Sequence, residues 1–337
     1  MDAFSTISAR GISNKLSNVV NDGADFGPDT KGTKTSGISE AISYSKSGNI
    51  VLLGGRFAIR EKLIINEGIN IFGGQRSILV NETDDFFEPF VLFKPYTYID
   101  FLVADANKKS GIQVGLPNQN NFIKIGTLKV YNVGDIYSDK YGAQSSVAIK
   151  GYNVNFDYID IDGGNTGLLF NECADIRGND VQVVNCSTGI NVISAEHVWL
   201  SNFTVDSCRY VGIQIDSSHD ISVKGKLWNN ASAYPDNKLV NAIQLGKYSS
   251  TNENLLINGE IEVIGTGGTA FYIENSRLCT FNLQIVNAPL NVKTQKIEVG
   301  IQFGENNHDN AFNGSINGVD KPVVGRPTGK IGIAGIV

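Results

Sequence analysis

A short motif that recurs along the chain limits the possible folds more than any other feature of the sequence. Each copy consists of a small residue, an apolar residue, a variable residue and a second apolar residue, as in the segments 166–170, 188–192 and 211–215. The small residue falls at positions 167, 189, 212, 242, 270 and 300, so the copies lie 22 to 30 residues apart. A period of this length with short alternating strands is typical of a solenoid, in which each repeat forms one coil.

Two further alternating segments accompany the motif in each repeat. One precedes it, for example Val181-Gln182-Val183, and a shorter one opens the coil, for example Val198-Trp199-Leu200. In such segments the apolar residues at i and i+2 point to one side of the strand, and the residue between them points to the other. Three strands per coil predict an all-β fold, a single-stranded right-handed parallel β-helix with three faces.

The regularity of the repeats divides the chain into parts. The first residues are polar and aperiodic, a helix is expected over 35–46, and the repeats stop after Asn313. A helix at the start has a physical reason, since it caps an open strand edge that would recruit another chain. The apolar end of the chain is expected to pack on the last coil or on neighbouring subunits. The predicted parts are an N-terminal arm for attachment (1–20), the first coils with their capping helix (21–75), the β-helix body (76–315) and a C-terminal tail (316–337).

Within the body, the segment 76–145 is less regular than the coils after it. Pro89 and Pro95 limit the pairing of central strands there, and residues 135–144 are expected to form a long loop. Two insertions in later turns, near 229–238 and 293–298, are expected on one side of the stack.

The charge of the chain argues against several kinds of partner. The formal net charge is −6 and no run of Lys or Arg is present. Nucleic-acid binding therefore lacks an electrostatic basis, and an acidic surface does not favour anionic lipid. No apolar run approaches a membrane span, and residues 1–20 contain no continuous apolar stretch of the kind found in signal peptides. We predict no nucleic-acid partner and no membrane insertion.

Two of the four cysteines occupy matching positions in successive repeats. Cys186 and Cys208 would therefore lie about 4.8 Å apart along the stack. This spacing predicts a ladder of small buried thiols, with a disulfide as the alternative. No Cys/His spacing typical of a zinc site occurs.

The order of motifs near the start of the chain has a counterpart among known proteins. Asp25-Phe26-Gly27 is followed by the expected helix 35–46, by a Gly-rich strand over 50–57 and by Gly73-Gly74. This order resembles the N-terminal part of the pectate-lyase-like superfamily of right-handed parallel β-helices, although Gly54-Gly55-Arg56-Phe57 replaces that superfamily's Pro-Ala-Gly turn. The resemblance implies the fold. It does not define an activity, because the fold occurs in lyases, hydrolases, epimerases and adhesins.

Together with the polar arm and the apolar tail, the chain looks like a bacteriophage tailspike or receptor-binding protein of this superfamily. That resemblance implies a homotrimer on the virion, with host surface polysaccharide as its ligand. A large head-binding domain is lacking, which implies a separate phage tail adaptor protein as a further partner.

Carboxylates and one tryptophan form the first candidate site. No familiar catalytic motif is intact, but glycoside hydrolysis needs only two carboxyl groups about 5 to 9.5 Å apart. Asp160 and Asp162 are two residues apart on one strand, which places them about 6.6 Å apart on one face. Asp162 and Asp206 are equivalent residues two coils apart, about 9.6 Å, and Trp228 follows one coil further. We predict Asp160, Asp162 and Asp206 as catalytic and Trp228 as carbohydrate-binding; the alternative is ordinary solvated aspartates.

A row of amides and one phenol forms the second candidate site. Gln214, Gln244, Tyr272 and Gln302 fall in one outward column, with acidic residues beside it. Such a row suits sugar hydroxyls, and it equally suits packing against a partner subunit. We predict Gln214, Gln244 and Tyr272 as carbohydrate-binding.

Metals, cofactors and histidines play no part in the predicted sites. Asp157, Asp160 and Asp162 are dense enough for calcium, but no EF-hand loop surrounds them, so we predict neither a metal site nor a cofactor. The chain has three histidines, which we expect to be exposed turn residues: His197, His219 and His308.

The favoured interpretation is a phage tailspike that binds host cell-surface polysaccharide during adsorption, acting outside the cell from the virion. Whether it also cleaves the polysaccharide as a glycoside hydrolase stays open. One alternative is a non-enzymatic structural or adhesive spike. Another is a free polysaccharide lyase or epimerase, for which Arg177, Arg209 and Lys224 are the candidate basic residues.

Overall fold

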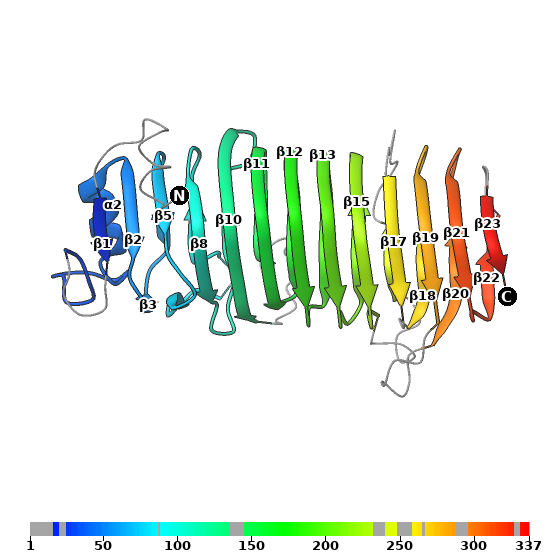
Figure 1. The fold of residues 1–337 in the computed structure, drawn as a ribbon, viewed down its shortest axis with the longest axis horizontal. Coiled ribbons are helices and arrows are strands. Elements are labelled where there is room, and N and C mark those ends of the chain that lie inside the picture. The colour runs from blue at the N-terminus through cyan, green and yellow to red at the C-terminus, as the bar shows by residue number, and fades with distance from the viewer. Residues whose placement is uncertain are drawn as a thin grey trace.

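The chain forms one elongated stack of parallel coils. The computed structural model describes residues 16–19, 25–86, 88–134, 145–231, 240–247, 258–264, 267–287, 296–326 and 331–336. A helix lies near one end of the long axis and the last strands lie at the other (Figure 1). Neighbouring coils pair through parallel strands throughout the stack. The fold is a right-handed parallel β-helix, as predicted.

The N-terminal end begins with a strand and a short helix. Strand β1 (Leu16–Val19) pairs with β2, so residues 16–19, expected in a polar arm, belong to the stack instead. Helix α2 (Ile38–Ser45) is shorter than the predicted 35–46, because Gly37 takes a left-handed turn directly before it. A Cβ at Gly37 would lie 2.5 Å from the backbone nitrogen of Gly27, so only glycine fits. The helix buries Ile38, Ala41 and Ile42 and covers the first coils, as expected of a cap.

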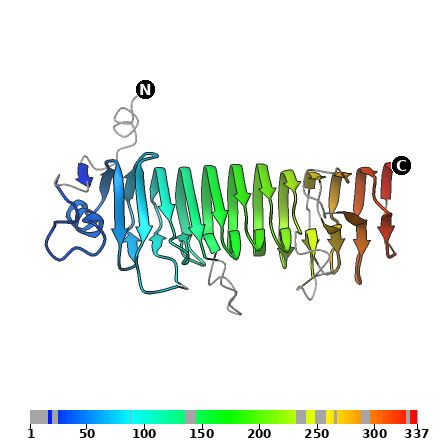
Figure 2. The same ribbon diagram turned by 90° about the horizontal axis from the view of Figure 1, so that it is seen from below.

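Each full coil has three faces, which we name from β12. The motif face contains residues 166–171, the middle face residues 174–178 and the closing face residues 180–184. Four long strands run around the corners between faces; they are β10 (Asn120–Val133), β11 (Ser145–Gly163), β12 (Thr166–Val184) and β13 (Thr188–Asp206). Figure 2, turned by 90°, shows the stack from a second side.

Shorter strands make up the coils on both sides of these four. The N-terminal coils contain β2 (Gly48–Leu52), β3 (Gly55–Ile59), β4 (Leu63–Ile65), β5 (Ile69–Phe72), β6 (Ser77–Asn81), β7 (Val91–Phe93), β8 (Tyr98–Asp105) and β9 (Ile112–Val114). The C-terminal coils contain β14 (Val211–Asp216), β15 (His219–Trp228), β16 (Asn241–Leu245), β17 (Asn258–Ile264), β18 (Gly268–Ile273), β19 (Thr280–Val286), β20 (Ile297–Phe303), β21 (Ala311–Asn317), β22 (Lys321–Val324) and β23 (Ile331–Ile336).

Inward-facing apolar side chains from the three faces fill the interior. On the motif face, Ile149, Phe170 and Val192 stack from coil to coil and are fully buried. Glycines stand next to large rings: a Cβ at Gly178 would lie 2.1 Å from Cζ of Phe156. The glycine thus leaves the room that the neighbouring ring fills, which is how an interior reaches native packing density.

The N-terminal half of the body is more regular than the sequence suggests. Strands β6 to β9 pair in parallel with their neighbours, so the segment up to residue 134 belongs to the stack. Pro95 lies between β7 and β8, where no ladder hydrogen bond is required of it. The expected loop at 135–144 lies outside the described residues, as do most of the two expected insertions.

The coils also extend further toward the C-terminus than predicted. The repeats were expected to stop after Asn313, but β22 pairs with β20, and β23 pairs with β21. The apolar Gly-rich tail therefore forms the last strands of the stack. Its residues do not keep the motif spacing, which is why periodicity alone placed the end too early.

All four cysteines are buried and free. Burial raises the pKa of Cys173 to about 12. The pKa of Cys186 is raised by its contact with Cys208 and by burial. The ladder of buried thiols is confirmed, and the alternative disulfide is not formed.

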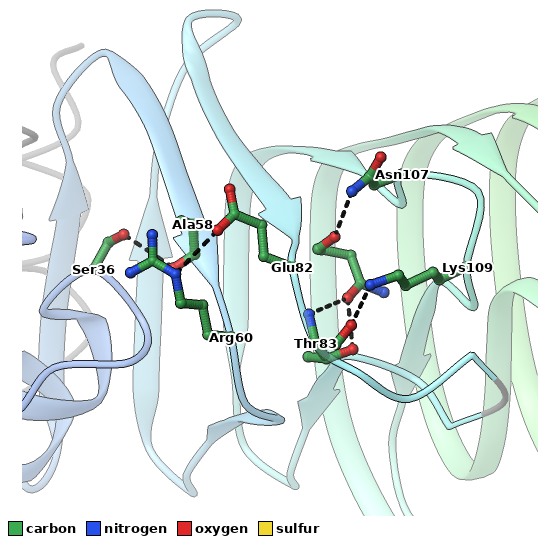
Figure 3. A network of polar contacts seen from close by, with 8 residues as sticks. Ser36, Ala58, Arg60, Glu82, Thr83, Asn107 and Lys109 are labelled. Carbon is green, nitrogen blue, oxygen red and sulfur yellow. Dashed lines mark hydrogen bonds and ion pairs between the residues drawn. The ribbon is translucent and has the colours of Figure 1, made fainter.

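Polar contacts also tie the turns of successive coils together. At the N-terminal end, Asn107 donates from Nδ2 to the carbonyl oxygen of Asn81 at 3.1 Å, Lys109 contacts the carbonyl oxygen of Thr83, and Arg60 pairs with Glu82 at 3.1 Å (Figure 3). These groups find their partners within the network, so it holds the turns rather than a ligand.

One corner of the coil repeats the same backbone conformation at successive levels of the stack. Close to the corner between the motif face and the middle face, the coils share a left-handed residue at one register position, with φ between 47° and 73°. The strand registers align these residues in one column, which we call the corner row: Gly68, Tyr96, Phe122, Asn153, Asp175, His197 and Asp220.

Candidate functional site

The predicted carboxylates lie on the closing face in the predicted columns. The register aligns Asp162, Val184, Asp206 and Trp228 in four successive coils. Asp160 lies in the neighbouring column of the same face. The ring of Trp228 is 38% exposed at the end of β15. The chain therefore brings these residues onto one surface, and their role there stays a prediction.

The carboxylate of Asp160 forms an ion pair. The ammonium Nζ of Lys129, one coil earlier, lies 2.9 Å from Oδ2 of Asp160. This hydrogen bond raises the pKa of Lys129 above its ordinary value. Lys129 also lies over the ring of Tyr158, 5.4 Å from its centroid. The lysine thus holds the Asp160 carboxylate in place.

Asp162 and Asp206 bind asparagines of the next coil. Asn185 donates from Nδ2 to Oδ1 of Asp162 at 2.8 Å, and Asn229 donates to Oδ1 of Asp206 at 3.3 Å. Both asparagines take left-handed conformations at a corner. The same pairing occurs at Asp105, which accepts from Asn132 at 3.0 Å. Because the pattern repeats at three levels of the stack, it fits a structural ladder that secures the corner better than a catalytic pair.

The predicted amide row lies on the motif face. The register aligns its members in successive coils, and it adds Asn191 one coil before Gln214. Asn191 was not among the predicted residues. It occupies the variable position of the motif, as Gln214 and Gln244 do, so the same sequence pattern could have identified it. The amide row is Asn191, Gln214, Gln244, Tyr272 and Gln302.

Two side chains of the amide row are buried, unlike those of an ordinary column of outward-facing strand residues. Gln214 is 9% exposed and Gln244 only 1% exposed, whereas Tyr272 and Gln302 are half-buried. Oε1 of Gln244 accepts from Nδ2 of Asn241 at 3.0 Å. Nε2 of Gln244 is buried with no hydrogen-bond partner in the part of the chain that the structure describes, and Oδ1 of Asn191 is in the same state. Unsatisfied buried amide groups of this kind are uncommon and call for a physical reason.

Acidic side chains flank the row, as the sequence indicated. Gln214 donates from Nε2 to Oδ2 of Asp216 at 2.7 Å, and the Tyr272 hydroxyl donates to Oε2 of Glu274 at 2.7 Å. Burial and the Glu274 carboxylate raise the pKa of Tyr272 well above its ordinary value. Tyr272 therefore stays a neutral donor at any physiological pH, and its oxygen keeps acceptor capacity for a ligand.

The histidines form contacts that the sequence did not suggest. His197 and His219 were expected to be exposed turn residues, but they are partly exposed and lie in β13 and β15. His197 lies between two acids of the corner row. Its Nδ1 is 3.4 Å from Asp175 and its Nε2 is 3.2 Å from Asp220. His219 lies 2.8 Å from Glu196.

The basic residues named for a lyase are engaged elsewhere. Arg177 lies over Trp199 and Arg209 over Tyr210, at 5.3 Å and 5.1 Å from the ring centroids. Lys224 also has an interaction partner. These contacts do not gather the three residues into one groove.

Neither a metal centre nor a membrane segment is found where the structure describes the chain. No group of three or more His, Cys, Asp or Glu side chains in those residues could hold a metal ion. Of the helical segments described, none has the length and apolar character needed to cross a membrane.

Comparison with known proteins gives one informative likeness. No protein-family model and no curated protein matches the sequence. Among solved structures, the chain is similar to the Dettilon tailspike protein, with a TM-score of 0.64 and 13% identity over 94% of this chain and 68% of that one. At this identity the likeness establishes the fold alone.

Two enzyme modules share a more distant likeness. They are the A-modules of the Azotobacter vinelandii mannuronan C-5 epimerases AlgE6 and AlgE4, with TM-scores of 0.31 and 0.24 and identities of 10% and 11%. The alignments cover 89% and 88% of this chain and 93% and 91% of the modules. Scores this low support no inference.

Proposed function

We propose that the chain is a β-helical spike that binds polysaccharide along the amide row. The proposal rests on the state of the Gln244 side chain. Its Nε2 group is buried without a partner in the described residues, in a row that also contains the unpaired Oδ1 of Asn191. Leaving a buried amide group unpaired costs about 1 to 3 kcal/mol. A ligand that supplies hydroxyl and ether oxygens would remove that cost.

The chemistry of the whole row supports a carbohydrate ligand. Amide groups both donate and accept, the Tyr272 hydroxyl does the same, and Asp216 and Glu274 add acceptors. A ligand with many hydroxyl groups matches such alternating donors and acceptors. Tyr272 and Gln302, the half-buried members of the row, are where such a ligand would contact it.

The biological setting belongs to the same proposal. The fold shared with the Dettilon tailspike protein supports a phage tailspike that binds host cell-surface polysaccharide and acts from the virion. A homotrimer, attached through a phage tail adaptor protein, is the assembly we propose for it.

Substitution of Gln244 by glutamate tests the site. Glutamate keeps the oxygen that accepts from Asn241 but has no N–H to donate. We expect the affinity for the bound polysaccharide to fall about tenfold, the value of one lost hydrogen bond to a buried group. Binding is measured on an array of bacterial O-antigen and capsular polysaccharides.

The matched control is Gln284→Glu, the same substitution at an exposed position on the closing face. It should leave binding unchanged. Absence of binding by the natural protein to every polysaccharide of the array would contradict the proposed function, and equal binding by the Gln244→Glu variant would remove the amide row from it.

Cleavage by the closing-face carboxylates is a separate proposal. If these aspartates are catalytic, Asp160→Asn combined with Asp162→Asn will abolish the release of reducing ends from the bound polysaccharide, while the circular dichroism spectrum stays unchanged. The Lys129 and Asn185 contacts of these aspartates favour a structural role instead. Unaltered release by the double variant would exclude them as catalytic groups.

A further inference from the structure

An exposed aromatic pair stands on the corner row, away from both sites described above. The rings of Tyr96 and Phe122 stack with their centroids 5.5 Å apart and their planes 18° from parallel. Both side chains are more than half exposed, at 57% and 53%. Tyr96 lies two residues before β8, and Phe122 lies in β10, the neighbouring strand in the stack (Figure 1).

The backbone at both rings has a conformation that aromatic residues disfavour. Their φ angles are 59° for Tyr96 and 47° for Phe122. Glycine, asparagine and aspartate tolerate this region best, and they occupy the neighbouring places of the corner row at Gly68, Asn153 and Asp175. Two aromatic residues at these places therefore reduce stability rather than increase it. Backbone strain of this kind concentrates at functional sites.

A buried asparagine holds the pair rigidly. Asn121 is fully buried, and its Nδ2 donates to the carbonyl oxygen of Lys150 at 2.8 Å while its Oδ1 accepts from the amide of Leu116 at 2.9 Å. Its own carbonyl oxygen accepts from the amide of Tyr96 at 2.6 Å. One residue thus fixes the backbone at both rings, and a pre-organised surface of this kind loses little entropy when it binds.

Two glycines pack tightly against the side chain of Asn121. A Cβ at Gly115 or at Gly151 would lie 2.7 Å or 2.3 Å from Nδ2 of Asn121. Both glycines have left-handed backbones, with φ of 81° and 74°. The side chain of Asn121 therefore fits only because two flanking residues have no side chain.

The size of the patch identifies the kind of partner. Two half-exposed rings offer on the order of 200 Å², whereas a stable subunit interface buries about 800 Å² on each partner. The next residues along the corner row are Gly68 and the polar Asn153, so the apolar surface does not continue. An area of this size matches one or two pyranose rings.

The neighbouring polar groups match a sugar as well. Asn153 donates from Nδ2 to Oδ1 of Asn120 at 2.9 Å in an exposed position beside Phe122. A pyranose presents an apolar C–H face to an aromatic ring and hydroxyl groups to such amides. Nucleobases also stack on aromatic rings, but a net charge of −6 disfavours a phosphate backbone.

We propose that Tyr96 and Phe122 form a second carbohydrate-binding site, which stacks on the C–H face of a neutral sugar. The class of ligand rests on the proposed function, but the residues do not, since they lie on another part of the coil. A stacking subsite remote from the amide row would let one polysaccharide chain engage the stack at two places, which raises avidity without new contacts at either one.

Asparagine substitutions test the proposal. Asparagine suits a left-handed corner, as Asn153 shows, so Tyr96→Asn and Phe122→Asn should fold with a Tm no lower than that of the natural protein. Saturation-transfer NMR with maltohexaose and cellohexaose reports sugar C–H groups in contact with the protein. We expect each variant to reduce the transfer about fivefold, in line with the value of one aromatic contact.

Leu278→Asn is the matched control, because Leu278 is an exposed apolar residue with a φ of 58° and no aromatic partner among the described residues. It should leave the transfer unchanged. Absence of transfer in the natural protein, or equal transfer in the Tyr96 and Phe122 variants, would overturn the proposal.

Two further outcomes distinguish a sugar site at the pair from a subunit contact and from the amide row. If light scattering shows that Phe122→Asn lowers the molecular mass in solution, the pair is a subunit contact and the proposal is wrong. If the polysaccharide array gives no binding while the hexaoses still bind at the pair, the proposed function fails and this site remains.

Discussion

Replacement of Gly189 by valine should lower the free energy of unfolding of the central coils by about 3 kcal/mol, at the upper end of what overpacking costs. Gly189 occupies the small position of the motif in β13. A Cβ there would lie 2.5 Å from the carbonyl oxygen of Gly212 and 2.4 Å from Cγ1 of Val205. The carbonyl cannot move without disturbing the pairing of β13 with β14. Urea unfolding followed by circular dichroism measures the change.

Gly74→Val is the matched control, because a Cβ at Gly74 would have no atom within 4 Å. It should change the free energy of unfolding by less than about 0.5 kcal/mol, as surface substitutions usually do. If Gly189→Val unfolds at the same urea concentration as the natural protein, backbone proximity is not what restricts this position.

This clash explains why the sequence predicted the fold so well. The registers align the small residues in one column, where the backbones of adjacent coils come close. From Gly111 to Gly300 the column holds nothing larger than an alanine or serine side chain, and its members there are Gly111, Ser146, Gly167, Gly189, Gly212, Ala242, Ala270 and Gly300. One coil outside this run, the register places Phe90 before it and Pro322 after it. Because the same restriction on side-chain size recurs once per coil, it produces a periodic pattern in the sequence. Periodicity is the feature that a single sequence shows most clearly.

The repeat pattern predicted which candidate residues share a column, but it did not predict the side chains that contact them. Asp162, Asp206 and Trp228 stand in the predicted column, and Gln214, Gln244 and Tyr272 stand in theirs. The asparagines that bind the two aspartates come from the next coil, and only side-chain conformations decide that they do so. The repeat pattern also does not indicate that Gln244 is buried while Tyr272 and Gln302 of the same row are half-buried.

Features that contradict local preference were the hardest to predict. Aromatic residues rarely adopt left-handed backbones, so nothing local marked Tyr96 and Phe122 as members of one corner row. The last strands were missed for a related reason, because the Gly-rich tail favours flexible chain by composition and forms strands only against the coil before it. Tertiary contacts overrode propensity at both places.

Phe312→Ala should have the second large effect, a loss of about 3 to 5 kcal/mol confined to the C-terminal coils. Phe312 is buried in β21 and contacts three other rings, with centroids 5.4 Å from Phe271, 5.7 Å from Phe281 and 5.5 Å from Phe303. Its removal leaves a cavity where its edge-to-face contacts with Phe271 and Phe303 and its stacked contact with Phe281 were. The rings come from β18, β19, β20 and β21, so this cluster joins the last coils to one another.

The effect should stay local because each coil of a solenoid contacts only its neighbours, and stability is the sum of such contacts. Hydrogen exchange should therefore accelerate in β18 to β21 but not in β11 to β13, where no contact to Phe312 exists among the described residues. Phe312→Leu, which fills most of the cavity, should recover much of the protection. If exchange instead accelerates equally in all coils, the stack unfolds as one cooperative unit, and a change at the amide row would then be felt along the whole length of the molecule.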